Sequence, residues 1–272
     1  MRDIKLVVFD IDGTLIDDDR KLISENIEAI KKLKALGIRV VLNSGRTFNA
    51  MWKVRQALDL MGFDDYSICW TGAFVRRNAD GKALISNPLG KADYEKVLAL
   101  LGDEDVQVSV HTKNYLYLNE EVPNRGFLED QAQVGLAWMK FEKFEDIEDG
   151  ISRIAIDGES EVLDSIYEKY EQVLKKDYKL MRNEVHVMEV LNKNSGKSET
   201  LKKLCEKLAV RADELMYFGD GINDVKSLGF AGVGVAMGSG KDEAKDAATY
   251  VIGSNNEPSI AKFLEEYFCL ND

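Results

Sequence analysis

Short runs of apolar residues alternate with amphipathic helical segments at both ends of the chain, and this rhythm constrains the fold more than any other feature. Strands that are apolar throughout are typical of a parallel sheet whose two faces are both covered by helices. The expected strands are residues 5–9, 38–42, 66–70, 215–218, 233–236 and 250–252. The first expected helix has Ser24 as its N-cap and ends at Gly37, and two others cover residues 47–61 and 196–208. Three further helices are expected to begin near residues 224, 241 and 257.

The middle of the chain has a different pattern, in which polar and apolar side chains alternate as they do in half-buried antiparallel strands. The elements expected here are the strands 106–111, 115–118, 151–156 and 185–190 and a helix over 161–174. We therefore expect an α/β protein with a doubly wound, Rossmann-like parallel sheet as its core domain, residues 1–83 plus 187–272. An α+β cap domain, residues 84–186, is inserted into it.

Charge and cysteine content exclude several classes of protein. The net charge of −12 disfavours nucleic acid or an anionic membrane as a partner, because such partners require basic surfaces. No apolar run approaches the roughly 18 residues of a membrane span, and the charged N-terminus does not fit a signal peptide. The cysteines Cys69, Cys205 and Cys269 are far apart and lack metal-binding spacing. We expect a cytoplasmic protein that is a monomer or a weak homo-oligomer.

Polar residues follow the core strands where ligands of a parallel sheet bind, at the carboxyl ends. Asp10 and Asp12 follow the first strand, and the segment Asn43-Ser44-Gly45-Arg46 follows the second. The segment "GDGINDVKSL", residues 219–228, follows the strand 215–218, and Lys197 lies near the start of the preceding helix. Carboxylates suit a hard divalent cation, and a hydroxyl with backbone N–H groups suits an anion. The sequence thus predicts a metal-assisted phosphoryl site.

These motifs carry a family resemblance. "DIDGTL", "NSGRT", Lys197 and "GDGINDVKSL" resemble the four motifs of the haloacid-dehalogenase-like superfamily. Residues 235–264 are similar to the C-terminal stretch of its Cof-like sugar-phosphatase branch, type IIB with a C2 cap. The expected position of the cap agrees with this branch. Only 34 positions separate Asp10 from Ser44, which is too few for a cap, whereas 153 separate Ser44 from Lys197. The chain departs from the branch at Trp70-Thr71-Gly72-Ala73, where Thr-Asn-Gly-Ala is frequent, and at Leu228, where Met is common.

The resemblance implies a Mg²⁺-dependent phosphatase of small phosphorylated metabolites, with sugar phosphates as the expected substrates. It implies that Asp10 is the nucleophile, forming an aspartyl-phosphate, and that Asp12 is the general acid and base. The implied phosphate-binding residues are Ser44, Gly45, Lys197 and Asn223. The implied metal site consists of Asp10, Asp12 through its backbone carbonyl, and Asp220 as ligands, with Asp224 orienting the waters of the metal. Selectivity would come from the cap, which contains Arg125, Arg153, Arg182 and His111.

Other interpretations use the same residues. A phosphotransferase or phosphomutase of sugar phosphates would employ the same aspartyl nucleophile while excluding water. P-type ATPases have a segment like "GDGIND", but they need Lys-Thr after the nucleophile, and here Ile11-Asp12 stands there. A phosphate-binding P-loop around Lys197 would require glycine at Leu191. Asn255 is a weaker candidate for contact with the phosphate.

Overall fold

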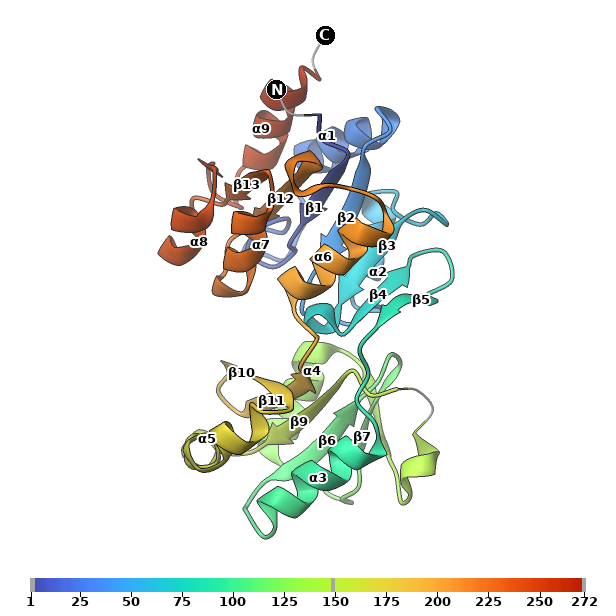
Figure 1. The fold of residues 1–272 in the computed structure, drawn as a ribbon, viewed down its shortest axis with the longest axis vertical. Helices are drawn as coiled ribbons and strands as arrows, with labels where there is room; N and C mark the ends of the chain where they lie inside the picture. Colours follow the sequence, from blue (N-terminus) through green and yellow to red (C-terminus); the bar gives the residue numbers. More distant parts are fainter. Residues whose placement is uncertain (1–2, 148–149, 271–272) are drawn as a thin grey trace. The chain divides into compact units, whose positions relative to one another are not determined.

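An eight-stranded sheet is the centre of one of the two units into which the computed structural model divides (Figure 1). The structure describes residues 3–147 and 150–270. The core unit holds residues up to 45, 51–85 and those from 196 on, and the cap unit holds 46–50 and 86–195. The strands of the large sheet are β1 (Leu6–Phe9), β2 (Arg39–Asn43), β3 (Tyr66–Cys69), β4 (Phe74–Arg77), β5 (Ala83–Ser86), β12 (Leu215–Gly219), β13 (Val233–Ala236) and β14 (Tyr250–Val251).

The strand order is β14-β13-β12-β1-β2-β3-β4-β5. Neighbours from β14 to β3 run parallel, and β4 returns antiparallel to β3. The core helices are α1 (Ser24–Ala35), α2 (Trp52–Ala57), α6 (Lys197–Lys207), α7 (Val225–Phe230), α8 (Asp242–Ala247) and α9 (Ser259–Phe268). The predicted α/β fold with a mainly parallel core sheet is confirmed.

Both faces of the core sheet are covered, as its apolar strands require. On one face Leu6 and Val8 pack with Leu201 and Leu204 of α6, in a cluster that also includes residues of α7 and α8. On the other face Phe9 of β1 stacks on Phe218, which meets Phe263 of α9 edge-on. Helix α1 contacts α9 on this side, where the Asn26 side chain accepts a hydrogen bond from the backbone of Ala261.

Two local expectations about the helices were wrong. The helix expected over 47–61 is only Trp52–Ala57, because Thr47 Oγ1 accepts the N–H of Ala50 in a turn and Asp59 has a left-handed backbone. Ser24 is not the N-cap of α1; Ile23 holds that position, and the Ser24 hydroxyl donates to Glu25.

The cap unit is built on a six-stranded sheet with order β10-β11-β9-β6-β7-β8. Its strands are β6 (Gln107–His111), β7 (Tyr115–Leu118), β8 (Ala137–Lys140), β9 (Arg153–Asp157), β10 (Tyr178–Glu184) and β11 (Val187–Asn192), and its helices are α3 (Lys91–Leu101), α4 (Arg125–Val134) and α5 (Ser160–Leu174). All neighbouring strands are antiparallel except β7 and β8. The inserted α+β sheet is thus present, and β11 pairs within it. Domain boundaries at 83/84 and 186/187 stay a prediction.

The two faces of the cap sheet differ. Apolar side chains of α3 and α5 cover one face, in a cluster that includes Val97, Leu163, Val110, Ile154 and Met188. The opposite face carries the polar side chains Ser109, His111, Arg153, Asp157 and Glu189, and α4 contacts β9 and β11. Across the described part of the chain, every helix is too short or too polar to span a bilayer.

Candidate active site

The register of the core sheet brings three strand ends to one level. Strand β1 lies between β2 and β12, with Phe9 opposite Leu42 on one side and Phe218 on the other. The next residue, Asp10, donates its N–H to the carbonyl oxygen of Phe218 over 2.9 Å. Because parallel strands end at the same edge, the residues following β1, β2 and β12 lie along one edge of the sheet.

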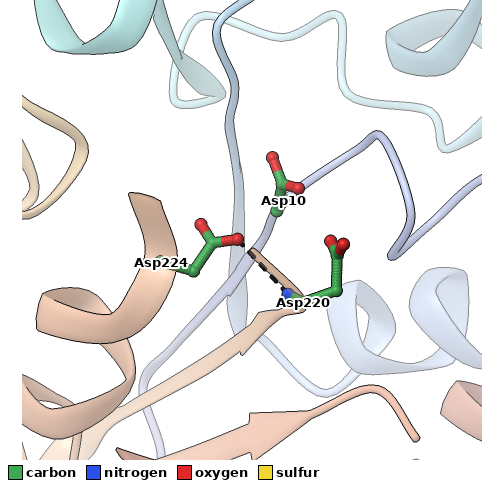
Figure 2. A group of neighbouring side chains, drawn as sticks. All are labelled: Asp10, Asp220 and Asp224. Carbon is green, nitrogen blue, oxygen red and sulfur yellow. Dashed lines mark hydrogen bonds between the residues drawn. The ribbon is translucent and has the colours of Figure 1, made fainter. Parts of the chain in front are cut away.

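An acidic cluster lies at this edge. One carboxyl oxygen from each of Asp10, Asp220 and Asp224 lies within 4.8 Å of the other two, and Figure 2 shows the three side chains side by side. Asp10 and Asp224 are buried and Asp220 is half-buried. Asp224 Oδ2 accepts the N–H of Asp220 (3.3 Å) and the N–H of Gly221 (3.1 Å), so the turn at the end of β12 folds Asp224 back toward Asp10.

A buried lysine joins two of these acids. Lys197 is the first residue of α6, and its Nζ donates to Asp10 Oδ1 over 2.6 Å and to Asp224 Oδ1 over 2.9 Å. The Asn43 side chain donates to the backbone carbonyl of Lys197 (3.2 Å), and the Tyr217 hydroxyl donates to Asp224 Oδ1 (2.7 Å). Sequence reasoning missed Tyr217 as a site residue, because a tyrosine within an apolar strand resembles a core side chain.

The electrostatics of the cluster favour a bound cation. Burial raises the pKa of Asp10 well above its usual range, against the attraction of Lys197, and it also raises the pKa of Asp220. Burial alone would lower the pKa of Lys197, but Asp10 and Asp224 outweigh this and raise it. When all three carboxyl groups are ionised, they carry two negative charges in excess of the one ammonium, and uncompensated charges in a buried site are costly. Oxygen ligands with this excess charge fit a hard divalent ion such as Mg²⁺.

The segment after Asp10 is shaped around Asp220. Gly13 has φ +80°, and a Cβ atom there would lie 2.4 Å from Asp220 Oδ2. Thr14 Oγ1 donates to Asp220 Oδ1 over 2.7 Å. The Gly-Thr pair of "DIDGTL" thus leaves room for one metal-ligand candidate and orients it.

The second loop has Ser44 buried and Gly45 exposed at the end of β2. The Ser44 N–H donates to the carbonyl oxygen of Ile68 over 3.0 Å, and the Ser44 carbonyl accepts the N–H of Thr71 over 3.2 Å. These bonds tie the loop to β3 and to the turn that follows it. Both partners are backbone groups, so the loop is held independently of any ligand.

Other predicted site residues lie outside the acidic cluster. The side chains of Asp12 and Asn223 are exposed. Arg46 is half-buried, in the segment that groups with the cap unit. Asn255 donates to the Ile16 carbonyl (3.0 Å) and to Asp18 (3.2 Å), which gives it a structural role in holding the hairpin after Asp12.

Comparison with known proteins agrees with this geometry. The family model of haloacid dehalogenase-like hydrolases matches residues 7–264. The Bacillus subtilis 5-amino-6-(5-phospho-D-ribitylamino)uracil phosphatase YitU is 27% identical, over 97% of this chain and 98% of its own length.

Two solved structures share the fold. A haloacid dehalogenase-like hydrolase from Bacteroides thetaiotaomicron has a TM-score of 0.87 at 23% identity, covering 97% of this chain and 100% of that one. The subclass IIB sugar phosphatase BT4131 has a TM-score of 0.74 at 21% identity, covering 98% and 99%. The chain therefore belongs to the haloacid dehalogenase-like hydrolases and is a phosphatase.

Proposed function

We propose that this phosphatase hydrolyses the phosphate ester of a polyhydroxylated metabolite in a Mg²⁺-dependent reaction, with Asp10 as the nucleophile. The observation that carries the proposal is the cluster of Asp10, Asp220 and Asp224 around the ammonium group of Lys197. It combines a nucleophilic carboxylate with a concentration of negative charge that a divalent cation can balance.

The metal ligands would be the side chains of Asp10, Asp220 and Asp224 and the backbone carbonyl of Asp12. When bound there, Mg²⁺ would reduce the repulsion between Asp10 and an incoming phosphate dianion. The residues that keep this site in shape are Thr14, through its bond to Asp220, and Tyr217, through its bond to Asp224.

The reaction follows from the roles of two aspartates. A carboxylate oxygen of Asp10 attacks phosphorus, the bond to the leaving alcohol oxygen breaks, and Asp12 gives that oxygen its proton. Asp12 then takes a proton from water, which attacks phosphorus and breaks the bond to Asp10. Inorganic phosphate leaves, and both aspartates return to their starting state. Ser44, Gly45, Lys197 and Asn223 would hold the phosphoryl oxygens throughout.

The substrate class is proposed from the relatives. YitU is named for a substrate with phosphate on a ribityl chain, and BT4131 is named a sugar phosphatase. Both kinds of substrate carry the phosphate on a polyhydroxylated carbon chain. A hexose phosphate or a phosphoribityl compound is thus the class to test first, with selectivity assigned to the cap.

The test is phosphate release from a panel of hexose, pentose and ribityl phosphates, with flavin and pyridoxal phosphates for comparison. We expect release with Mg²⁺, none after chelation, and recovery when Mg²⁺ is restored. The Asp10→Asn variant is the matched control and should be inactive, because its amide cannot form the covalent intermediate. Activity of the chelated enzyme would contradict the metal role, and conversion to an isomeric sugar phosphate without free phosphate would indicate a phosphomutase instead.

A further inference from the structure

The residues Trp70, Thr71 and Gly72 form an unusual turn directly after β3. Their φ angles are 51°, 50° and 84°, so three successive residues adopt the left-handed conformation. This conformation is unfavourable for any L-residue and most unusual for a β-branched one such as threonine. Glycine or asparagine would make the same turn with less strain. Strain of this kind persists only where the surrounding structure enforces it, and it is frequent at functional sites.

Contacts of the backbone explain why the turn exists. The Thr71 N–H donates to the Ser44 carbonyl over 3.2 Å, and the Gly72 carbonyl accepts the buried hydroxyl of Thr200 over 2.7 Å. Gly72 admits no side chain, because a Cβ there would lie 2.3 Å from the Gly196 carbonyl oxygen. The turn therefore connects the Ser44 loop with the start of α6, which carries Lys197. None of these contacts needs the side chain of Thr71.

The side chain of Thr71 lies against the predicted phosphate loop. Its Oγ1 is 3.4 Å from the position that a Cβ of Gly45 would occupy, and the residue is only 8% exposed. Within the described residues, the hydroxyl of Thr71 makes no hydrogen bond. Its oxygen is not among the fully buried side-chain atoms without a partner, so it is accessible to a ligand that lies beside the loop after β2.

We propose that Thr71 is a further phosphate-binding residue, whose hydroxyl donates a hydrogen bond to a phosphoryl oxygen of the substrate beside Ser44 and Gly45. The proposal rests on the proposed function, since it takes the same phosphoryl site as given. The left-handed turn orients the binding group, because it directs the Thr71 hydroxyl toward the loop after β2. A threonine here also takes a position where asparagine is frequent in the branch.

The test compares Thr71→Val with Thr71→Ser. Valine keeps the shape and the strain of threonine but lacks the hydroxyl, whereas serine keeps the hydroxyl. The probe is inorganic phosphate, measured as a competitive inhibitor of the wild-type reaction and by calorimetric titration with Mg²⁺ present. We expect Thr71→Val to weaken phosphate binding and raise KM by about tenfold, the usual effect of losing a hydrogen bond to a charged group. Thr71→Ser should restore most of the affinity.

Unfolding in urea separates this role from a structural one. Thr71→Val should unfold at the wild-type midpoint, and Thr71→Gly, which removes both hydroxyl and strain, should fold and show the same weak phosphate binding. Unchanged phosphate binding in Thr71→Val, or equal losses in the valine and serine variants, would overturn the proposal. A wild-type enzyme that releases phosphate from no ester would instead overturn the proposed function, because the calorimetric titration needs no turnover.

Discussion

Gly13 and Gly37 have the same backbone angle φ but different surroundings. Comparing alanine at the two positions therefore separates the cost of backbone strain from the effect of displacing a site residue. Both have φ +80°. A Cβ on Gly13 would lie 2.4 Å from Asp220 Oδ2, whereas nothing lies within 4 Å of the corresponding position at Gly37. Alanine at either position therefore has the same conformational cost, and only alanine at Gly13 displaces a metal-ligand candidate.

We predict that Gly13→Ala and Gly37→Ala each lower the free energy of unfolding by about 1–2 kcal/mol. Only Gly13→Ala should reduce kcat/KM, by about 10²-fold, because a small displacement of a catalytic group has a large effect. Urea unfolding and phosphate release measure the two effects. Similar activity in both variants would show that the space beside Asp220 is unimportant.

The residues of the site differ in how far sequence could predict them. Asp10, Asp220, Asp224 and Lys197 were predicted to lie together because three strand ends and one helix start meet at one edge, and their clustering is confirmed. The roles assigned to them stay predictions. The left-handed angles of Thr71 could not be predicted, because threonine alone gives no sign of that conformation.

On the cap sheet, the face opposite α3 and α5 holds a network of buried charges. Arg153 Nη2 donates to both carboxyl oxygens of Asp130, over 2.5 and 2.6 Å, and its Nη1 pairs with Glu189. Its Nε donates to His111 Nδ1 over 3.1 Å. Burial, and then the charge of Arg153, holds the pKa of His111 well below its usual value, so this imidazole is neutral. Arg153 and His111 are therefore engaged within the cap. Arg125 likewise pairs with Glu129 and Arg182 with Asp164, so all four of these side chains have partners inside the cap.

Asp157 makes the stability of this element depend on pH. It is buried and accepts the Ser109 hydroxyl over 2.6 Å, and burial, with repulsion from Asp130, raises its pKa to about 8. The unfolded pKa is about 3.9. Between these two values the folded state binds more protons than the unfolded state. Asp157 therefore makes its full contribution to the free energy of unfolding below about pH 4, and this contribution is lost as pH rises toward 8.

We predict that Asp157→Asn, which is neutral at every pH, removes this decline. The free energy of unfolding, measured in urea from pH 5 to 8, should fall less steeply with pH than in the wild type. Asp103→Asn, at an exposed position of the same unit, is the control and should follow the wild-type slope. Parallel curves for Asp157→Asn and the wild type would contradict the assigned protonation.

The sequence predicts some strands and helices of the cap better than others. The strands 106–111 and 115–118 agree with β6 and β7, because alternation with a turn between is a strong signal. Helix α4 was missed. Its buried residues are Gly126, Phe127 and Asp130, so it lacks an apolar stripe, and the remaining sign was Asn124, whose side chain caps it by accepting the N–H of Phe127.

At the scale of the whole molecule, the two units have separate hydrophobic cores and the acidic cluster belongs to one of them. A ligand stabilises only those openings that disrupt its site. We predict that Mg²⁺ slows amide hydrogen exchange in β1, β12 and α6 and leaves β6, β9 and β11 unchanged. Hydrogen exchange with mass spectrometry measures this, and equal protection of both sheets would contradict a site confined to the core unit.

The most direct test of the account is to trap the phosphoryl group on Asp10. The Asp12→Asn variant should hydrolyse the intermediate at least about 10²-fold more slowly, because it lacks the general base. After mixing with substrate and Mg²⁺, acid quenching and digestion, mass spectrometry should find the phosphoryl group on the peptide at Asp10, and Asp10→Asn should show neither this peptide nor turnover. A phosphoryl group on another residue, or turnover by Asp10→Asn, would contradict Asp10 as the nucleophile.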